Sequence, residues 1–134
     1  NNFMSDIQKK ILIVVEDDGL LRRIISDKLK SMGYDVFQAE DGQAAIDQVL
    51  DRKPDLILLD LLIPKVDGFV VLEKIRTYPD KKVANTPVVV LSNLWSDKDI
   101  LRVKALKIDE YFVKANTDMD QVFERVKNLL NKQV

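Results

Sequence analysis

The sequence predicts an α/β fold of the (βα)5 kind, in which a doubly wound parallel sheet of five strands is covered by helices on both faces. Two observations predict it. Short runs rich in Val, Ile and Leu recur along the chain, as expected for strands buried on both faces. Each run is followed by a stretch whose apolar residues stand three or four positions apart, which indicates a helix with one buried face. Their alternation favours parallel strands joined by right-handed crossovers.

The strands are expected at five apolar segments. Residues 11–15, 56–59 and 88–91 are continuous apolar runs, and shorter strands are expected at 35–39 and 111–113. Periodicity alone does not fix the order of these strands in the sheet. We adopt the order 2-1-3-4-5 among the open α/β topologies.

A helix is expected after each strand. Helices begin at short polar residues, which accept backbone N–H bonds, or next to glycines that close a turn. The expected starting signals are Asp18, Gly42, Gly68, Ser96 or Asp97, and Thr117. Gly33 and Pro54 are placed to end the first two helices, and the third is expected to end near Arg76.

The composition limits the chemistry that this chain can perform. Its 134 residues fit one domain, and the net charge of −1 does not indicate a general nucleic-acid or membrane binder. The sequence contains no cysteine and no histidine, which excludes disulfides, thiol catalysis, thiolate metal sites and Ser-His-Asp chemistry. The available chemistry therefore depends on carboxylates, lysines, hydroxyls and a hard cation.

The sequence shows neither an apolar run long enough to span a membrane nor the layout of a signal peptide. We therefore expect a cytoplasmic protein. Met4 is a candidate natural start. Residues 1–9 are expected to be a disordered or cloning-derived segment, and residues 10–132 to form the domain.

Polar residues follow four of the expected strands. They are Glu16, Asp17 and Asp18 after the first strand, Asp60 after the third, Ser92 and Asn93 after the fourth, and Lys114 after the fifth. Each alone has an ordinary structural explanation, since acidic residues cap helices and form turns. Parallel strands, however, bring their carboxyl ends to one edge of the sheet, where ligands bind in open α/β folds. Their joint occurrence therefore favours a functional site.

The acidic residues of this group need a compensating charge. Two like charges about 4 Å apart repel by roughly 4 kcal/mol at an effective dielectric constant near 20. Such a group either shifts its pKa values or binds a cation, and oxygen ligands select a hard cation such as Mg²⁺. Because Mg²⁺ commonly shares phosphate oxygens, the pattern suggests phosphoryl chemistry. Asp60 would then be the nucleophile, with Lys114 and Ser92 assisting.

The chain resembles the receiver domain of two-component response regulators, a chemotaxis-regulator-like, flavodoxin-like fold. The resemblance covers about residues 10–131 and rests on four segments: 15–17, 55–68, 88–92 and 111–114. The second of these carries the spacing D-x-x-x-x-D-x-x-x-P-x-x-D-G around Asp60, which is specific in combination with the others.

The resemblance implies a role for each site residue. Asp60 would accept a phosphoryl group from a sensor histidine kinase or a phosphotransfer protein, and Lys114 would pair with that group. Glu16, Asp17, Asp60 and the backbone carbonyl of Leu62 would hold Mg²⁺. Ser92 and Tyr111 would switch, and would relay the state to the face formed by helix 4, strand 5 and helix 5.

The same resemblance implies a phosphoacceptor signalling domain and not a conventional enzyme, with self-catalysed phosphorylation and slow autodephosphorylation only. An output domain or partner protein would bind the switching face. No direct contact with nucleic acid or membrane is expected. The sequence leaves open whether this is a stand-alone receiver or part of a longer regulator.

Several positions differ from the usual pattern of the family. Ala115 follows Lys114, where a proline preceded by a cis bond is usual. Because a cis bond to a non-proline residue costs about 2.5–4 kcal/mol, we expect a trans bond. Asn93 stands where Ala or Gly is usual and could narrow access to Asp60. Lys107 and Ile108 replace a small Gly-Ala pair, which we interpret as drift in a turn.

Three further side chains bear on the chemistry of the expected site. Leu62 and Leu94 occupy positions that influence how water reaches the acyl phosphate in this family. Neither can orient water, so we predict slow self-dephosphorylation. Trp95 is either a partner contact or a cover for its loop.

Three other functions are alternatives to this one. A phosphorylation-independent docking module would keep the fold but not the chemistry. A metal-dependent phosphohydrolase with an aspartyl nucleophile commonly has a second acid two positions after the nucleophile, where this chain has Leu62. A flavodoxin-like FMN binder needs a phosphate loop after the first strand, where Glu16, Asp17 and Asp18 would repel phosphate.

Overall fold

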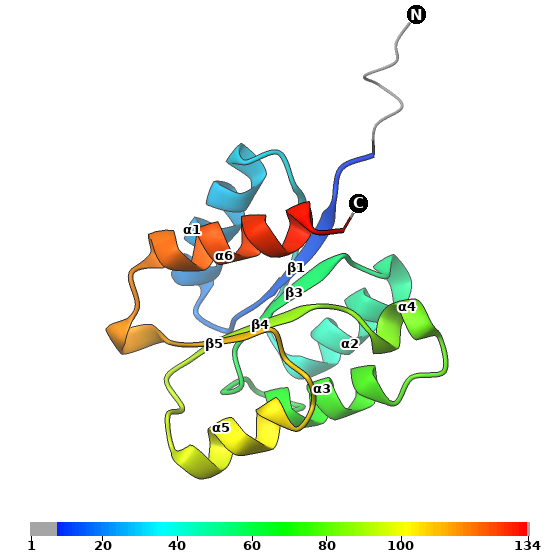
Figure 1. Cartoon of the computed structure of the whole chain (residues 1–134), viewed down its shortest axis with the longest axis vertical. Coiled ribbons are helices and arrows are strands. Elements are labelled where there is room, and N and C mark those ends of the chain that lie inside the picture. The colour runs from blue at the N-terminus through cyan, green and yellow to red at the C-terminus, as the bar shows by residue number, and fades with distance from the viewer. Residues whose placement is uncertain (1–7, 134) are drawn as a thin grey trace, which may run out of the picture.

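The computed structural model describes residues 8–133, which form a parallel five-stranded sheet between two layers of helices (Figure 1). The strand order β2-β1-β3-β4-β5 confirms the expected 2-1-3-4-5 order. The strands are β1 (Ile11–Val15), β2 (Asp35–Ala39), β3 (Leu56–Leu59), β4 (Val88–Ser92) and β5 (Glu110–Val113). The last two strands are each one residue longer than expected, because the β4–β5 ladder pairs Val89 with Glu110 and Ser92 with Val113.

The expected helices are all present in the described part of the chain. They are α1 (Gly19–Ser31), α2 (Gly42–Arg52), α3 (Gly68–Arg76), α5 (Asp97–Lys104) and α6 (Met119–Asn131). Two short elements were not predicted: the single turn α4 (Lys81–Ala84) and the 3-10 turn η2 (Lys114–Asn116). Elements of three or four residues are too short to show a helical period, so the apolar pattern could not reveal them.

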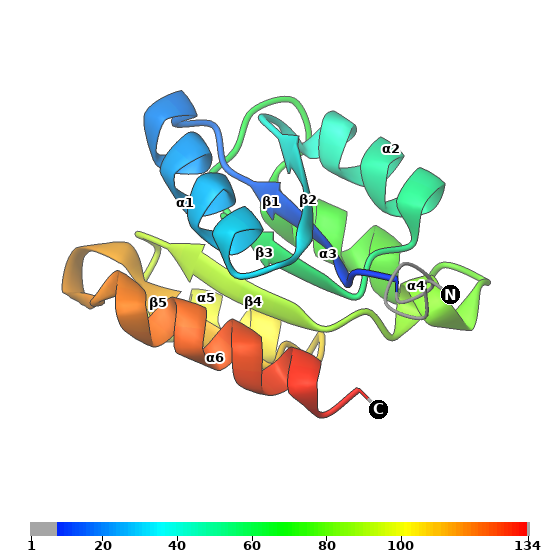
Figure 2. The same cartoon turned by 90° about the horizontal axis from the view of Figure 1, so that it is seen from above.

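The two faces of the sheet carry separate apolar cores. Helices α1 and α6 cover one face, and α2, α3 and α5 cover the other (Figures 1 and 2). Along β1, Leu12 and Val14 pack toward α1 and α6, whereas Ile13 and Val15 pack into the opposite core. Successive side chains of a strand point to opposite faces. Burial of both faces therefore explains why this strand is apolar throughout.

The predicted helix caps are mostly confirmed. The Asp18 carboxylate accepts the N–H groups of Leu20 and Leu21 at the start of α1, and Ser96 caps α5. The prediction of Thr117 as the cap of the last helix is wrong. Asp118 caps α6, and the Thr117 hydroxyl instead donates to the carbonyl of Val113 at 2.6 Å.

The turn between α5 and β5 contains a strained residue. Lys107 has a φ of 60°, in the left-handed region, where a side chain costs about 1 kcal/mol. Its carbonyl accepts a hydrogen bond from Arg76, 3.2 Å away. The usual glycine of the family would relieve this strain, and nothing in the structure explains why lysine stands here.

Most of the expected N-terminal segment, residues 1–9, falls on residues 1–7, which lie outside the described residues. Gln8 and Lys9 belong to no helix or strand. Across residues 8–133, no helix has both the length and the apolar character required to cross a membrane.

Candidate functional site

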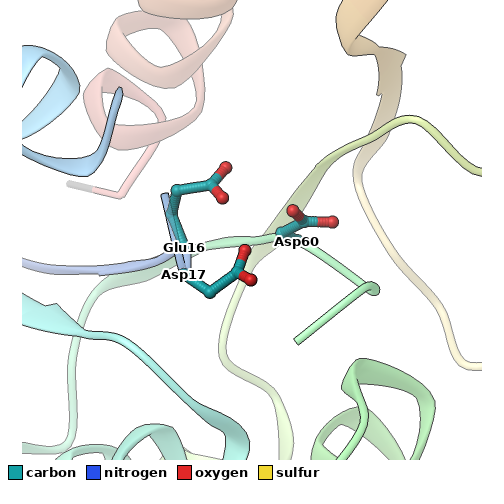
Figure 3. Close-up of side chains that lie close together, drawn as sticks. All are labelled: Glu16, Asp17 and Asp60. Carbon is teal, nitrogen blue, oxygen red and sulfur yellow. The ribbon is translucent and has the colours of Figure 1, made fainter. Parts of the chain in front are cut away.

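Three acidic side chains meet at the carboxyl edge of the sheet. Glu16 and Asp17 follow β1, and Asp60 follows β3. These two strands are paired, with Val15 opposite Leu59, so the residues after them are neighbours. One carboxylate oxygen from each of the three acids lies within 4.8 Å of the others, and Figure 3 shows the three side chains close together. The predicted convergence of these acids is confirmed.

The third acid of the Glu16-Asp17-Asp18 run has a different place. The Asp18 carboxylate caps α1, and its backbone N–H donates to the Glu16 carboxylate at 3.1 Å. Asp18 therefore has the ordinary structural role of an acid at a helix start, while its N–H group orients Glu16.

Lys114 bridges the two buried acids. Its ammonium nitrogen lies 2.5 Å from a Glu16 oxygen and 2.7 Å from Asp60 Oδ2. Glu16 is only 2% exposed and Asp60 only 4%, whereas Asp17 is exposed. Burial of carboxylates is costly without a partner charge. The ammonium of Lys114 supplies that charge from β5's end, two strands away from β3.

Burial and pairing shift two pKa values in this group. Burial raises the pKa of Glu16 above its ordinary value, although the hydrogen bonds from Lys114 and from the Asp18 N–H oppose that shift. For Lys114 burial favours the neutral amine, but the hydrogen bonds to Asp60 and Glu16 outweigh it and raise its pKa. Lys114 is therefore a firmly charged ammonium within this site.

Both oxygens of Asp60 have partners. Lys114 donates to Oδ2, and the backbone N–H of Leu62 donates to Oδ1 at 3.0 Å. The structure thus places Leu62 beside Asp60 through its N–H group. The expected role of the Leu62 carbonyl toward a metal remains a prediction.

Ser92, the last residue of β4, and Tyr111, within β5, both contact the loop between β4 and α5. Ser92 is fully buried, and its hydroxyl accepts a long hydrogen bond of 3.4 Å from the N–H of Leu94. The Tyr111 hydroxyl donates to the carbonyl of the same Leu94. Within residues 8–133, neither Ser92 nor Tyr111 forms a hydrogen bond with Asp60.

The loop after Lys114 agrees with one prediction and adds a contact. The peptide between Lys114 and Ala115 is trans, as predicted. The N–H of Ala115 donates to the side-chain carbonyl of Asn93 at 3.1 Å. From sequence, Asn93 is one of the polar residues after the fourth strand and an obstacle near Asp60, but no local signal pairs it with a residue 22 positions away.

Gly68 supports the segment that carries Asp60, a role that its position at a helix start did not predict. Its N–H donates to the Leu61 carbonyl at 3.0 Å. A side chain at Gly68 would approach the backbone of Leu61 to 2.5 Å and the carbonyl of Asp60 to 2.8 Å. Only glycine allows this close approach of α3 to the segment that carries Asp60. The Asp-Gly pair at 67–68 was the available signal.

The donor set of this site fits a hard divalent cation. All three clustered acids offer carboxylate oxygens, the ligands that Mg²⁺ prefers. Among residues 8–133, Lys114 is the ammonium that pairs with Glu16 and Asp60, so three carboxylates face one positive charge and negative charge remains for a cation to neutralise. Exposure of Asp17 leaves one side open to water and to a phosphate group, both of which Mg²⁺ retains as ligands.

Sequence comparison with known proteins identifies a family model and several relatives that match this chain. A family model for the response regulator receiver domain matches residues 12–127. The DNA-binding dual master transcriptional regulator RpaA of Synechocystis is 35% identical over 121 residues, which are 90% of this chain and 49% of RpaA. A probable transcriptional regulator, ycf27, of Cyanophora paradoxa is 32% identical over 95% of this chain and 51% of its own length. The chain thus spans about half the length of these curated relatives.

Solved structures show the same likeness in three dimensions. The receiver domain of the Francisella response regulator 1452 has a TM-score of 0.82 at 28% identity, covering 94% of this chain and 100% of that one. The N-terminal receiver domain of Klebsiella pneumoniae RstA, activated with BeF3, has a TM-score of 0.75 at 28% identity, covering 90% and 97%.

Proposed function

This chain belongs to the response regulator receiver domain family, and we propose that Asp60 accepts a phosphoryl group from a sensor histidine kinase or a phosphotransfer protein. One observation carries the proposal: Asp60 is a buried carboxylate held between the Leu62 N–H and the Lys114 ammonium, with Glu16 and Asp17 within 4.8 Å. A single nucleophile surrounded by charge-stabilising groups fits phosphoryl transfer.

The reaction transfers one phosphoryl group, and no atom is oxidised or reduced. An Asp60 carboxylate oxygen attacks the phosphorus of a phosphohistidine. The phosphorus–nitrogen bond breaks, and its electron pair returns to the imidazole nitrogen. The Lys114 ammonium pairs with the phosphoryl oxygens as their charge moves to Asp60, and the Leu62 N–H keeps the carboxylate oriented.

The proposed metal is Mg²⁺, held by Glu16, Asp17, Asp60 and the carbonyl of Leu62. When bound, it neutralises charge on the phosphate oxygens that approach Asp60. Lys114 pairs with both Glu16 and Asp60, so the ammonium and a cation share these carboxylates. Metal affinity should therefore depend on Lys114 as well as on the acids.

The proposed switch is the loop between β4 and α5. Ser92, the last residue of β4, is buried directly before this loop, and the carbonyl of Leu94 within the loop accepts a hydrogen bond from the Tyr111 hydroxyl. A phosphoryl group on Asp60 offers new acceptor oxygens to Ser92. Movement of Ser92 toward them shifts the loop and with it the Tyr111 contact, as a population shift between two packings. The signal would reach the face formed by α5, β5 and α6. These are the fourth expected helix, the fifth strand and the fifth expected helix, because the unpredicted turn α4 shifts the helix numbers by one.

The partners follow from this arrangement. A histidine kinase or phosphotransfer protein would bind near Asp60. The two curated relatives described above are about twice as long as this chain and are transcriptional regulators by name, which supports a role upstream of an output domain or partner protein. The family is a signalling family, and we propose that this domain's only catalysis is its own phosphorylation and slow dephosphorylation.

Intact-mass measurement with a small phosphodonor tests the proposal. Incubation with phosphoramidate and Mg²⁺ is expected to add the mass of one phosphoryl group. The gain should be lost in Asp60→Asn and under EDTA. Asp67→Asn is the matched control, because Asp67 caps α3 outside the acidic cluster and asparagine caps equally well. It should be phosphorylated like the wild type.

Beryllofluoride addresses fast hydrolysis, which would hide the added mass. It mimics the phosphoryl group, and Trp95, the one tryptophan of the chain, reports on the adjacent loop. A fluorescence change in the wild type but not in Asp60→Asn supports the proposal. If the wild type shows no added mass and no fluorescence change, the proposal is contradicted, and a phosphorylation-independent docking module is favoured.

A further inference from the structure

Two residues that depart from the usual family pattern are bound to each other. Asn93 follows β4, and Ala115 is the second residue of η2. The backbone N–H of Ala115 donates to Asn93 Oδ1 at 3.1 Å, across 22 positions of sequence. A distance of 3.1 Å is within the normal range for an N–H···O bond.

This hydrogen bond requires both departures together. Proline has no backbone N–H and could not donate from position 115. Alanine or glycine at position 93 would offer no side-chain acceptor. One substitution therefore supplies the donor and the other supplies the acceptor, so the pair acts as one unit.

Each partner of this bond is the chain neighbour of a proposed site residue. Asn93 follows Ser92, and Ala115 follows Lys114. The bond thus ties the backbone beside Ser92 to the backbone beside Lys114. We propose that Asn93 is a positioning residue, which holds Lys114 in reach of Asp60 by fixing the loop that follows Lys114. The proposal rests on the proposed function of Asp60 and adds a specific contact to it.

This bond extends the connection between the segments after β4 and β5 beyond their ladder, which ends with Ser92 opposite Val113. Lys114 lies in η2, a turn of only three residues. At its end, the backbone N–H of Thr117 donates a long hydrogen bond of 3.4 Å to the Lys114 carbonyl. The Thr117 hydroxyl also closes this turn, by donating to the Val113 carbonyl at 2.6 Å. The Lys114 ammonium must keep distances of 2.5 and 2.7 Å to two carboxylates. A cross-loop bond at the next residue restricts the backbone from which Lys114 extends.

The bond also lies within an open hollow of about 470 Å³ lined by Asn93, Trp95, Val113, Ala115 and Asn116. Trp95 is 72% exposed. Because Trp95 lines the same hollow, its fluorescence reports on the segments that carry Asn93 and Ala115.

Removal of the acceptor tests the proposal. Asn93→Leu keeps a similar size without an acceptor, and Asn93→Asp keeps an acceptor oxygen. The rate at which phosphoramidate labels Asp60 is expected to fall roughly three- to tenfold in Asn93→Leu and to recover in Asn93→Asp. The matched control is Asn116→Leu, because Asn116 lines the same hollow and its side chain makes no hydrogen bond within residues 8–133. Equal slowing in Asn116→Leu would overturn the proposal.

A double variant separates positioning through this hydrogen bond from a general packing effect. Ala115→Pro by itself removes the donor. In the protein that already carries Ala115→Pro, Asn93→Leu should therefore change the labelling rate by less than about twofold. A full additional loss in the double variant would overturn the proposal, because the two residues would then act independently.

Amide hydrogen exchange gives a readout that does not depend on phosphorylation. In the unphosphorylated protein, exchange of the Ala115 amide should be several-fold faster in Asn93→Leu than in Asn116→Leu. Equal exchange in the two variants would overturn the proposal. Faster exchange supports it even if wild-type Asp60 takes no phosphoryl group, an outcome that would contradict only the proposed function.

Discussion

The ammonium of Lys114 lies 2.7 Å from Asp60 Oδ2, although 54 positions separate the two residues. The same ammonium lies 2.5 Å from Glu16. One lysine therefore compensates two buried carboxylates that come from different strands. Without a phosphoryl group on Asp60, these two ion pairs already connect the segments that follow β1, β3 and β5.

Replacement of Lys114 should expose the repulsion between these carboxylates. Lys114→Met is expected to lower the free energy of unfolding by about 2 kcal/mol in EDTA, because Glu16 and Asp60 lose their shared partner. Mg²⁺ should recover more stability in the variant than in the wild type. Urea unfolding with and without Mg²⁺ measures both effects, with Lys127→Met, on an exposed position of α6, as the control. An unchanged free energy in EDTA would contradict this account.

The phosphoryl group on Asp60 should persist far longer than a few seconds. Leu62 is half exposed beside Asp60, and its side chain has no polar group to orient an attacking water. Leu62→Asn supplies such a group and should shorten the lifetime several-fold, followed as loss of the added mass after the phosphodonor is removed. Leu101→Asn changes an equally apolar, exposed residue on α5 and should leave the lifetime unchanged. Decay of the wild type within seconds would refute the prediction.

A side chain at Gly68 should destabilise the protein and disturb Asp60. The new Cβ of Gly68→Ala would lie 2.5 Å from Leu61 Cα, and backbone cannot yield cheaply. We expect a loss of about 2–3 kcal/mol in the free energy of unfolding, and slower phosphorylation. Gly19→Ala is the control, since no atom approaches its Cβ closer than 3.8 Å. Comparable stability of the two variants in urea would show that α3 can shift freely.

Arg76 should contribute more to stability than an ordinary surface arginine. Its guanidinium donates to the carbonyls of four residues, Ala84, Thr86, Leu106 and Lys107. Arg76→Met would leave these acceptors without that donor and is expected to cost about 3 kcal/mol in thermal or urea unfolding. Arg102→Met removes an exposed ion pair with Glu73 and should cost under about 1 kcal/mol. Equal costs would contradict this difference.

Asp55 should make stability depend on pH. Burial opposes its charge, but the hydrogen bonds from Lys82 and from the N–H of Ile11 prevail and lower its pKa below the ordinary value. A lowered folded-state pKa contributes stability above the unfolded pKa, and this contribution is lost as the pH falls through the folded pKa.

Asp55→Asn should therefore lower the free energy of unfolding by about 1–2 kcal/mol at neutral pH. The difference from the wild type should shrink as the pH falls below about 3.9, the ordinary aspartate value. Urea unfolding over a pH series measures it, with the exposed Asp51→Asn of α2 as the control. A penalty that is the same at every pH would contradict an electrostatic origin.

The sequence was sufficient for features that depend on local pattern. Apolar runs located the strands, helical spacing located the five longer helices, and Asp18 and Ser96 marked two helix starts. Because parallel strands end at one edge, strand alternation also predicted that Glu16, Asp17 and Asp60 reach the same edge, and the pairing of β1 with β3 brings them within 4.8 Å. Even the trans bond before Ala115 followed from the identity of the residue.

Other features depended on contacts between distant residues, which no local period encodes. Thr117 has the right chemistry for a helix cap, but the Val113 carbonyl lies within reach of its hydroxyl, so Asp118 takes the cap. The bond between Asn93 and Ala115 exists only because β4 and β5 are adjacent. The sequence by itself thus determined which groups reach the edge of the sheet. Only the tertiary structure decided which of them pair, because hydrogen bonds and ion pairs form within about 3 Å, a separation that the packing of the strands sets.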